Sequence, residues 1–427
     1  MLGTLTSVIV LTFAAWLRLP EVSRGTVWAE DAAVFLKETI SIGALQSIPE
    51  PYSGYLHVIP RALSGLAYTL APIDSYAHAM SLLSCAAVAA IAVSVFYLSR
   101  SVIPQVPLRL MLAAIPVFLP VAPLEVLGNA ANLHWYLLWL SPWLLLHQAE
   151  RWYGKATLFV VALAVACSEI ITGLFLPLAL WTIIRRKNYW ASSGLILGVG
   201  LQILVTASKP RYTTVAPQGD AVEPLSVVYG FVLQAIGSMW ETDRRTVASS
   251  VVNFGGFAMI VPVTIVLGLL AYVILRGSLK WKAMAAYAVG AAAACWTAAI
   301  IVNAQASFNY AAFTMDDWLG QFGFFRYAAA PSMFLLALVP LAFGVAIERS
   351  REGSLRVGFL APAIMLMFLL VNYFPATTTR EAGPEWRMGV EAARDACAAD
   401  PALVAATVHA APTDWRADIP CAILLKP

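Results

Sequence analysis

The chain has 427 residues, of which 60% are hydrophobic and only 12% charged, and its mean hydropathy is +0.76. Soluble globular proteins carry about a quarter of their residues as charged ones, so this composition indicates a polytopic membrane protein. A formal net charge of +3, with the basic residues scattered in short clusters, argues against a nucleic-acid partner.

Apolar segments recur along the whole chain, and a membrane-spanning helix needs about 20 such residues. We predict about eleven spans, centred near residues 10, 86, 114, 139, 163, 178, 198, 266, 291, 336 and 364. The first segment lacks a basic region and an evident cleavage site, so we expect a retained helix. The predicted fold is an all-α membrane protein with a transmembrane domain over 1–374 and a C-terminal segment over 375–427.

Alternate connections between these segments carry the lysines and arginines, which is typical of cytoplasmic loops. The basic residues concerned are Arg100, Arg109, Arg151, Lys155, Arg185, Arg186, Lys187, Arg276, Lys280, Lys282, Arg349, Arg351 and Arg356. This pattern predicts a multi-pass protein of the plasma membrane with its N-terminus in the cytoplasm and its C-terminus outside.

The same alternation assigns the long connections to the outer face. They are residues 20–74, 208–254 and 303–325, together with the tail from 375 onward. Within the first outer loop, residues 32–45 and 55–71 are too short or too interrupted to span, so we expect helices lying in the interface. Near residues 167–173 the sequence "SEIITG" must turn within the membrane.

The cysteines fit this topology. Cys85, Cys167 and Cys295 lie in apolar segments, where a thiol behaves as a small hydrophobic group. Cys397 and Cys421 both lie in the tail, and an extracytoplasmic tail is in an oxidising compartment. We therefore predict a disulfide between them, the alternative being two unpaired thiols.

Common cofactor motifs are missing from the sequence. It has no Walker loop, no GxGxxG after a strand, no GxSxG and no HExxH, so an ATP-driven or hydride-transfer function has no support. Asp316 and Asp317 in "FTMDDWLG" lack a third positioned ligand, and we expect a solvated turn there. We predict no cofactor and no required metal.

An acidic pair, Glu30 and Asp31, follows the first apolar segment in "WAEDAAVF". Adjacent side chains point in different directions, so we expect only one of them to face a cleft. A carboxylate in a partly dehydrated cleft can act as a general base. The alternative is that the pair opens an interfacial helix, where carboxylates favour the positive N-terminal end.

A second polar cluster lies in "EPYSGYLHVIPRAL", with Glu50, Tyr52, Tyr55, His57 and Arg61. His57 and Arg61 share a face if the stretch is helical. Such donors suit a phosphate or a sugar, while the alternative is an aromatic belt with a snorkelling arginine.

A third cluster, "EVLGNAANLHWYLLW", brings polar groups into a membrane segment, which is costly unless they face a cavity or one another. Its members are Glu125, Asn129, Asn132, His134 and Trp135, and the asparagines with the tryptophan suit a carbohydrate surface. Glu169 lies deeper still, and we expect it to pair with an arginine.

A basic cluster completes the set, with Lys209 and Arg211 in "SKPRY" and Arg326 and Tyr327 in "FFRYAAAPS". An arginine can bind a phosphate through two parallel hydrogen bonds, whereas a lysine acts as a point charge. The alternative for Arg326 is an interfacial anchor.

Together these segments resemble the GT-C class of glycosyltransferases, the multispan enzymes that use polyprenyl-phosphate sugar donors at the outer membrane face. The segments that carry the resemblance are "WAED", "YSGYLHVIPR", "EVLGNAANLHWYL", "FRYAAAPS" and the tail "GPEWRMGVEAARDAC…PTDWRADIPC". The last four are similar to uncharacterised bacterial members, so the resemblance covers most of the chain.

The resemblance implies an inverting transfer in which a carboxylate of the first outer loop takes the proton of the acceptor hydroxyl. Asp31 is the first choice for this base, and Glu30 is the second. The leaving phosphate needs positive charge, for which Arg326 is the first choice, supported by His57, Arg61 and Arg211. The residues expected to line the sugar pocket are Asn129, Asn132, His134, Trp135 and Tyr327.

The implied partners are a polyprenyl-phosphate sugar, a cell-envelope glycan or glycolipid acceptor, and membrane lipid. A glycan polymerase is the second hypothesis, since it has comparable topology. A transporter or flippase for a lipid-linked sugar ranks third, because such proteins often show two related halves and this sequence shows none. A receptor or scaffold would leave the acidic and basic residues of the outer loops without a shared purpose.

Overall fold

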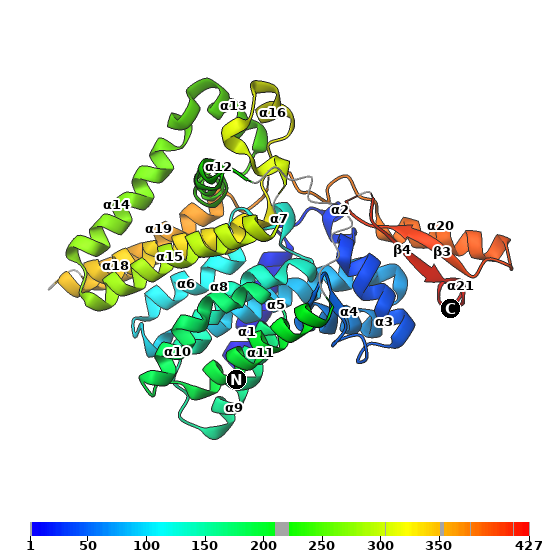
Figure 1. The fold of residues 1–427 in the computed structure, drawn as a ribbon, viewed down its shortest axis with the longest axis horizontal. Coiled ribbons are helices and arrows are strands. Elements are labelled where there is room, and N and C mark those ends of the chain that lie inside the picture. Colours follow the sequence, from blue (N-terminus) through cyan, green and yellow to red (C-terminus); the bar gives the residue numbers. More distant parts are fainter. Residues whose placement is uncertain are drawn as a thin grey trace.

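Helices make up most of the protein, in agreement with the predicted all-α class (Figure 1). A computed structural model describes residues 2–209, 222–303, 305–350, 354–375, 377–412 and 414–426. The larger helices are α1 (Leu2–Trp16), α5 (Tyr76–Leu98), α6 (Val106–Phe118), α8 (His134–Leu146), α9 (Trp152–Ala166), α10 (Leu176–Ile184), α11 (Tyr189–Ser208), α14 (Ile260–Arg276), α15 (Leu279–Val302), α17 (Ala329–Leu336), α18 (Leu338–Arg349) and α19 (Ser354–Val371).

Within the described residues, six helical stretches are long and apolar enough to cross a membrane, which supports the predicted multi-pass character. They are Ile73–Ser101, Val106–Glu125, Tyr189–Ser208, Arg244–Arg276, Leu279–Val302 and Arg326–Arg349. The other five predicted centres fall in the shorter helices α1, α8, α9 and α10 and in α19. All eleven predicted segments are therefore helical, while the number that crosses the membrane stays a prediction.

The turn predicted at "SEIITG" is confirmed. Helix α9 ends at Ala166, and the 3₁₀ helix η5 (Ile170–Phe175) begins after Glu169. The Glu169 carboxylate accepts the N–H of Ile171 at 2.7 Å, so it caps the new helix.

Helices α9 and α11 lie close together because two glycines face the neighbouring backbone. A Cβ at Gly194 would lie 2.3 Å from the Phe159 carbonyl oxygen, and one at Gly198 would lie 2.5 Å from the Ala166 Cβ. This is the small-xxx-small arrangement by which membrane helices approach each other.

The first loop is folded rather than extended. It contains α2 (Glu21–Arg24), the π-helical turn η1 (Asp31–Leu36), α3 (Lys37–Ile42), a hairpin of β1 (Pro51–Tyr52) with β2 (Tyr55–Leu56), and α4 (Val58–Leu70). The two segments expected to be interfacial helices are thus mostly helical. Ser53 and Gly54, with φ of 49° and 83°, form the turn of the hairpin, as primed turns require.

The remaining connections also hold short helices. They are α7 (Ala122–Glu125), α12 (Pro224–Gly230), α13 (Arg244–Phe254), α16 (Met315–Gly320), and, in the tail, α20 (Trp386–Ala399) and α21 (Cys421–Leu424). Thr314 and Asp317 form a capping box at the start of α16. The acidic pair of Asp316 and Asp317 is therefore part of a helix start and not of a simple turn.

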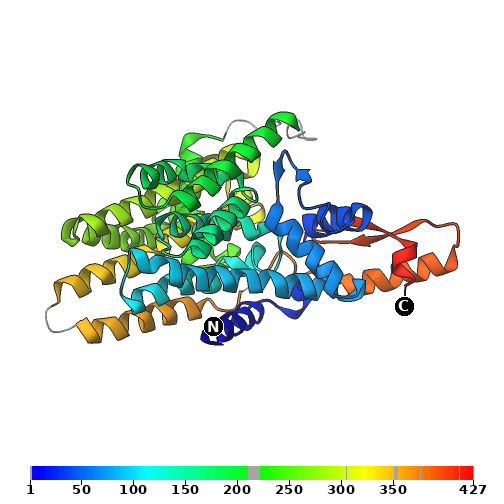
Figure 2. The same ribbon diagram turned by 90° about the horizontal axis from the view of Figure 1, so that it is seen from below.

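The tail packs against the first loop. Its antiparallel hairpin joins β3 (Ala405–His409) to β4 (Arg416–Pro420). The Ala29 N–H donates to the Ala411 carbonyl at 2.7 Å, and the Ala411 N–H donates to Val27 at 3.0 Å. Figures 1 and 2 show the tail and the first loop at the same end of the molecule, which we call the tail-side end. The predicted boundary at 375 therefore does not separate two independent packing units.

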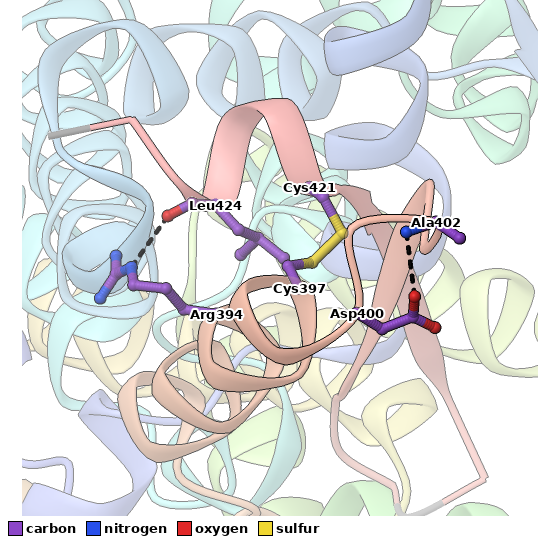
Figure 3. Close-up of a disulfide and its surroundings, with 6 residues drawn as sticks. All are labelled: Arg394, Cys397, Asp400, Ala402, Cys421 and Leu424. Atoms are coloured by element: carbon purple, nitrogen blue, oxygen red, sulfur yellow. Dashed lines mark hydrogen bonds between the residues drawn. A yellow bond between two sulfur atoms is a disulfide. The ribbon is translucent and has the colours of Figure 1, made fainter.

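The predicted disulfide is confirmed (Figure 3). Cys397 at the end of α20 and Cys421 at the start of α21 are bonded, with their Cα atoms 5.5 Å apart. Nearby, Arg394 donates to the Leu424 carbonyl at 2.8 Å and pairs with Asp74 of the first loop at 2.8 Å. The disulfide thus closes the tail where it meets the first loop.

Candidate functional site

A cavity of about 280 Å³ lies at the tail-side end of the bundle. Its walls come from the first loop, from the starts of α8 and η5, from the 3₁₀ helix that precedes α17, from the end of α15 and from the tail. Seven predicted site residues line this cavity, and they are Glu30, His57, Asn132, His134, Trp135, Arg326 and Tyr327. The structure therefore brings together residues that are up to about 300 positions apart in the sequence.

The adjacent carboxylates point in different directions, as predicted, but the cavity receives Glu30 and not Asp31. Glu30 lines the cavity, and its buried Oε2 has no hydrogen-bond partner among the described residues. Asp31 is fully buried, and its two carboxylate oxygens accept the N–H groups of Ala130 and Ala131 at 2.8 and 2.9 Å. The first choice of base, Asp31, therefore does not line the cavity, whereas the second choice, Glu30, does.

Asp31 instead fixes the turn that precedes α8, together with Arg380 from the tail. Arg380 donates to the carbonyls of Leu127 and Gly128 at 2.7 and 3.1 Å. Gly128 has φ +77°, and a Cβ there would lie 3.0 Å from the Arg380 guanidinium. Arg380 thus holds the carbonyls, and Asp31 the N–H groups, of the segment that positions Asn132 and His134.

His57 is a neutral ring in the cavity wall. Burial lowers the pKa of His57 to about 3, and the ring packs against Tyr55 with centroids 4.1 Å apart. Its Nε2 lies 3.3 Å from the Tyr52 carbonyl, which places the proton on Nε2. Its Nδ1 has no partner among the described residues. A neutral ring offering an acceptor suits a hydroxyl ligand better than the phosphate predicted for it.

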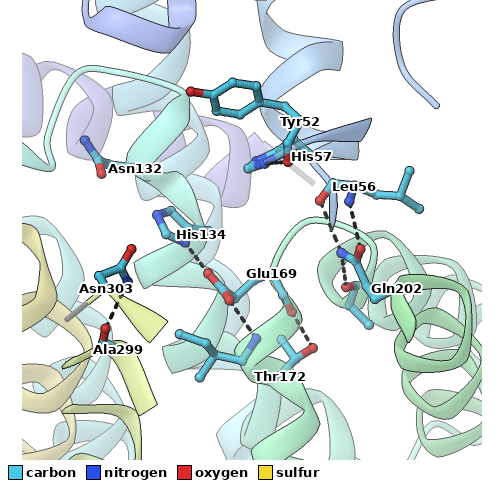
Figure 4. A network of polar contacts seen from close by, with 12 residues as sticks. Tyr52, Leu56, His57, Asn132, His134, Glu169, Thr172, Gln202, Ala299 and Asn303 are labelled. Atoms are coloured by element: carbon cyan, nitrogen blue, oxygen red, sulfur yellow. Dashed lines mark hydrogen bonds and ion pairs between the residues drawn. The ribbon is translucent and has the colours of Figure 1, made fainter. Parts of the chain in front are cut away.

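His134 is held by Glu169 at the centre of the cavity wall (Figure 4). The His134 Nδ1 is bonded to the Glu169 carboxylate, and the two side chains are 12% and 2% exposed. The predicted partner of Glu169, an arginine, is therefore wrong: His134, which is 35 positions away in the sequence, takes that place. With Nδ1 committed to the carboxylate, Nε2 is the nitrogen available to a ligand.

Arg326 begins the 3₁₀ helix η11 (Arg326–Ala328), directly before α17, and faces Glu125. Its Nη1 pairs with the Glu125 carboxylate at 2.7 Å, and its backbone N–H donates to the same carboxylate at 2.8 Å. A guanidinium carries five N–H donors, and the ion pair with Glu125 uses only part of them. The Arg326 side chain is 31% exposed, so its remaining donors are available to a ligand.

The other predicted residues do not line the cavity. Asn129 is fully buried, donating to the Glu125 carbonyl at 2.7 Å and accepting from the Asn132 N–H at 3.0 Å, so it shapes the turn instead. Arg61 is fully buried, paired with Glu38 and 5.0 Å from the Phe35 ring centroid. Arg211 lies outside the described residues.

A second cavity of about 390 Å³ adjoins the first. Both are lined by Glu30, Arg326 and Trp415, so these three side chains form a partition. The second cavity is lined further by Arg244, Gln321 and several aromatic residues, and those are Trp28, Phe322, Phe324 and Phe325.

Several lining residues of the first cavity were not predicted as site residues, and three of them are polar or amphipathic: Asn303, Trp415 and Tyr52. Asn303 follows the end of α15, Trp415 precedes β4 in the tail, and Tyr52 belongs to the second polar cluster, for which an aromatic belt was the alternative. For Asn303 and Tyr52 the available signal was a polar or amphipathic residue at the end of an apolar segment. Nothing in the sequence indicates that Trp415 crosses from the tail to the first loop.

Comparisons with protein-family models, with curated proteins and with solved structures give no match for this chain. Among the described residues, no group of three or more His, Cys, Asp or Glu side chains is placed to hold a metal ion. The chemistry of the site is therefore argued from its own geometry.

Proposed function

We propose that this protein is an inverting glycosyltransferase of the GT-C type, which moves a sugar from a polyprenyl-phosphate donor to a cell-envelope glycan or glycolipid at the outer membrane face. The observation that carries this proposal is the partition between the two cavities. There the carboxylate of Glu30 has an oxygen with no hydrogen-bond partner in the described part of the chain, and it lies next to the guanidinium of Arg326.

The unpartnered polar atoms around the first cavity support a ligand rich in hydroxyl groups. Glu30 Oε2 and His57 Nδ1 are acceptors, and Trp135 Nε1 is a donor, and all three are buried without a partner among the described residues. A buried polar group without a partner is costly. A hydroxyl both donates and accepts, so a sugar can satisfy all three, with Trp135 and Tyr327 also offering apolar ring faces.

In the proposed reaction the donor sugar occupies the first cavity and the acceptor hydroxyl reaches it across the partition. Glu30 takes the hydroxyl proton as the oxygen forms a bond to the anomeric carbon. The bond from that carbon to the phosphate oxygen breaks, and the electron pair leaves with the phosphate. Arg326 stabilises the developing negative charge. Attack opposite the leaving group inverts the anomeric configuration.

Glu30→Gln tests this proposal, with Glu21→Gln as the matched control. Glu21 is an exposed carboxylate of the same loop and does not line either cavity. Protein in nanodiscs would receive radiolabelled polyprenyl-phosphate sugars and a lipid extract as acceptor. We expect Glu30→Gln to bind the donor but to turn over roughly 10² to 10⁴ times more slowly, and Glu21→Gln to match the wild type.

Other results would point to the alternative functions. Wild-type protein that binds the donor and never releases its sugar to any acceptor would contradict the transferase and favour a lipid-linked sugar transporter. Long polymeric products from a lipid-linked oligosaccharide, with no transfer of single sugars, would favour a glycan polymerase.

A further inference from the structure

A third cavity, of about 580 Å³, lies at the opposite end of the same helices. Helix α8 lines the first cavity with His134 and Trp135, and this one with Trp139 and Trp143. Helix α15 also lines both cavities, the first with Val302 at its end and this one with Lys280 near its start. Figures 1 and 2 show the end of α14 and the start of α15 far from the tail. We call this space the basic-end cavity.

The basic-end cavity contains hydrogen-bond donors without acceptors. Trp139 and Trp143 are 1% and 6% exposed, and neither Nε1 has a partner among the described residues. The buried hydroxyl of Tyr287 also lacks a partner there. Most other lining residues are apolar, including Leu112, Leu146, Met284 and Leu341. An N–H group without an acceptor in such surroundings costs free energy, so this cavity fits a ligand that supplies acceptor oxygens and apolar chains.

Two lysines give the cavity a positive charge. Lys187, after the end of α10, lies 5.2 Å from the Trp181 ring centroid, and Lys280 lies 4.6 Å from that of Trp281. The adjacent carboxylate, Glu348, accepts from the Trp281 Nε1 at 2.5 Å and from the Ser278 hydroxyl at 3.2 Å. No salt bridge joins either lysine to a carboxylate within the described part of the chain.

We propose that the basic-end cavity binds one anionic glycerophospholipid from the leaflet on this side of the membrane. Its phosphate lies between Lys187 and Lys280, its ester oxygens accept from Trp139, Trp143 and Tyr287, and its acyl chains cover the apolar lining. The phosphodiester and the two esters of such a lipid offer acceptor oxygens and no donor. This matches the cavity, where the donors of Trp139, Trp143 and Tyr287 lack acceptors among the described residues. A basic pocket between membrane helices on the cytoplasmic side is a recurring setting for anionic headgroups. The site is independent of the proposed transferase activity.

Native mass spectrometry of the full-length protein tests this proposal. Protein would be equilibrated with equal amounts of phosphatidylglycerol and phosphatidylcholine of identical chains, and the retained lipid counted. We expect one phosphatidylglycerol per wild-type molecule. The variant Lys187→Gln with Lys280→Gln should retain phosphatidylglycerol roughly 10- to 30-fold less tightly, since each lysine near an anionic headgroup contributes about fivefold.

The matched control is Lys282→Gln, which removes a lysine from the same helix two residues away and outside the cavity lining. It should retain phosphatidylglycerol like the wild type. A second variant, Ala283→Phe, fills the cavity from an exposed lining position without removing charge, and should also lose the lipid. Any one of three results would overturn the proposal. They are equal retention of the two lipids by the wild type, a loss in Lys282→Gln equal to that in the double lysine variant, and displacement of phosphatidylglycerol by equimolar polyprenyl phosphate.

Discussion

At the scale of single residues, the adjacent carboxylates Glu30 and Asp31 have different surroundings. One Glu30 oxygen lies at the cavity without a hydrogen-bond partner among the described residues, whereas each Asp31 oxygen accepts a backbone N–H group. One short segment therefore contributes both to the partition and to the turn behind it, and the proposed base and the positioning carboxylate are separate residues.

Asp31→Ala should destabilise the protein. It leaves the buried N–H groups of Ala130 and Ala131 without acceptors, each at a cost of about 1–3 kcal/mol. We expect the free energy of unfolding to fall by about 2–4 kcal/mol, measured near pH 5 as thermal unfolding in detergent. Glu30→Gln should keep the wild-type midpoint. A stable Asp31→Ala variant would contradict the positioning role.

The stability should also depend on pH through Asp31. Burial raises the pKa of Asp31 from 3.8 to about 7, against the lowering effect of the Ala130 and Ala131 N–H groups. Between these values the folded protein binds the proton more tightly than the unfolded chain, so stability falls as pH rises from about 4 to 7 and then levels off. Unfolding midpoints measured across pH 4–8 should show this slope in the wild type, and Asp31→Ala should flatten it.

At the scale of helices, close packing of α9 on α11 depends on glycines that have no room for a side chain. Gly194→Ala would place a Cβ 2.3 Å from the Phe159 carbonyl oxygen, so the two helices must separate, at a cost of about 1–3 kcal/mol. Gly200→Ala is the matched control on the same helix, because a Cβ there meets nothing within 4 Å.

Thermal unfolding of both glycine variants measures the effect. We expect a lower midpoint for Gly194→Ala and an unchanged or slightly higher one for Gly200→Ala, since alanine is the better helix former. Equal midpoints would mean that α11 is not held by this contact. The Gln202 side chain, which bonds the Leu56 N–H at 2.7 Å and the Leu56 carbonyl at 3.1 Å, would transmit any shift of α11 to the first loop.

At the scale of the whole molecule, the tail completes the candidate site through Trp415. This residue lines both tail-side cavities, so Trp415→Ala should weaken donor binding by roughly 10-fold through the lost aromatic contact. Trp415→Phe should restore most of it. The control is Met388→Ala in α20, where the side chain is 64% exposed. This variant should bind donor normally. Donor titration of folded protein measures this, and wild-type affinity in Trp415→Ala would exclude the tail from the site.

The sequence predicted local features better than contacts between distant segments. Apolar length predicted the helices, and the shared compartment of Cys397 and Cys421 predicted their bond. Adjacency predicted that Glu30 and Asp31 would diverge, but not which of them faces the cavity, because that depends on the turn at residues 127–131. The His134 partner of Glu169 and the place of Trp415 were missed, since the helix ends and the tail meet only in the folded chain.

The docking of the tail on the first loop has a consequence for how the protein is made. Residues 27–30 leave the ribosome well before Ala411 and Trp415. The partition wall is therefore unfinished until the tail emerges, and the preceding helices form around a site that is still open. A nascent chain that stalls, or a product shortened by proteolysis before residue 411, holds Glu30 without the wall that encloses it. Synthesis of the segment with Ala411 and Trp415, rather than formation of the earlier helices, marks the moment at which the site closes.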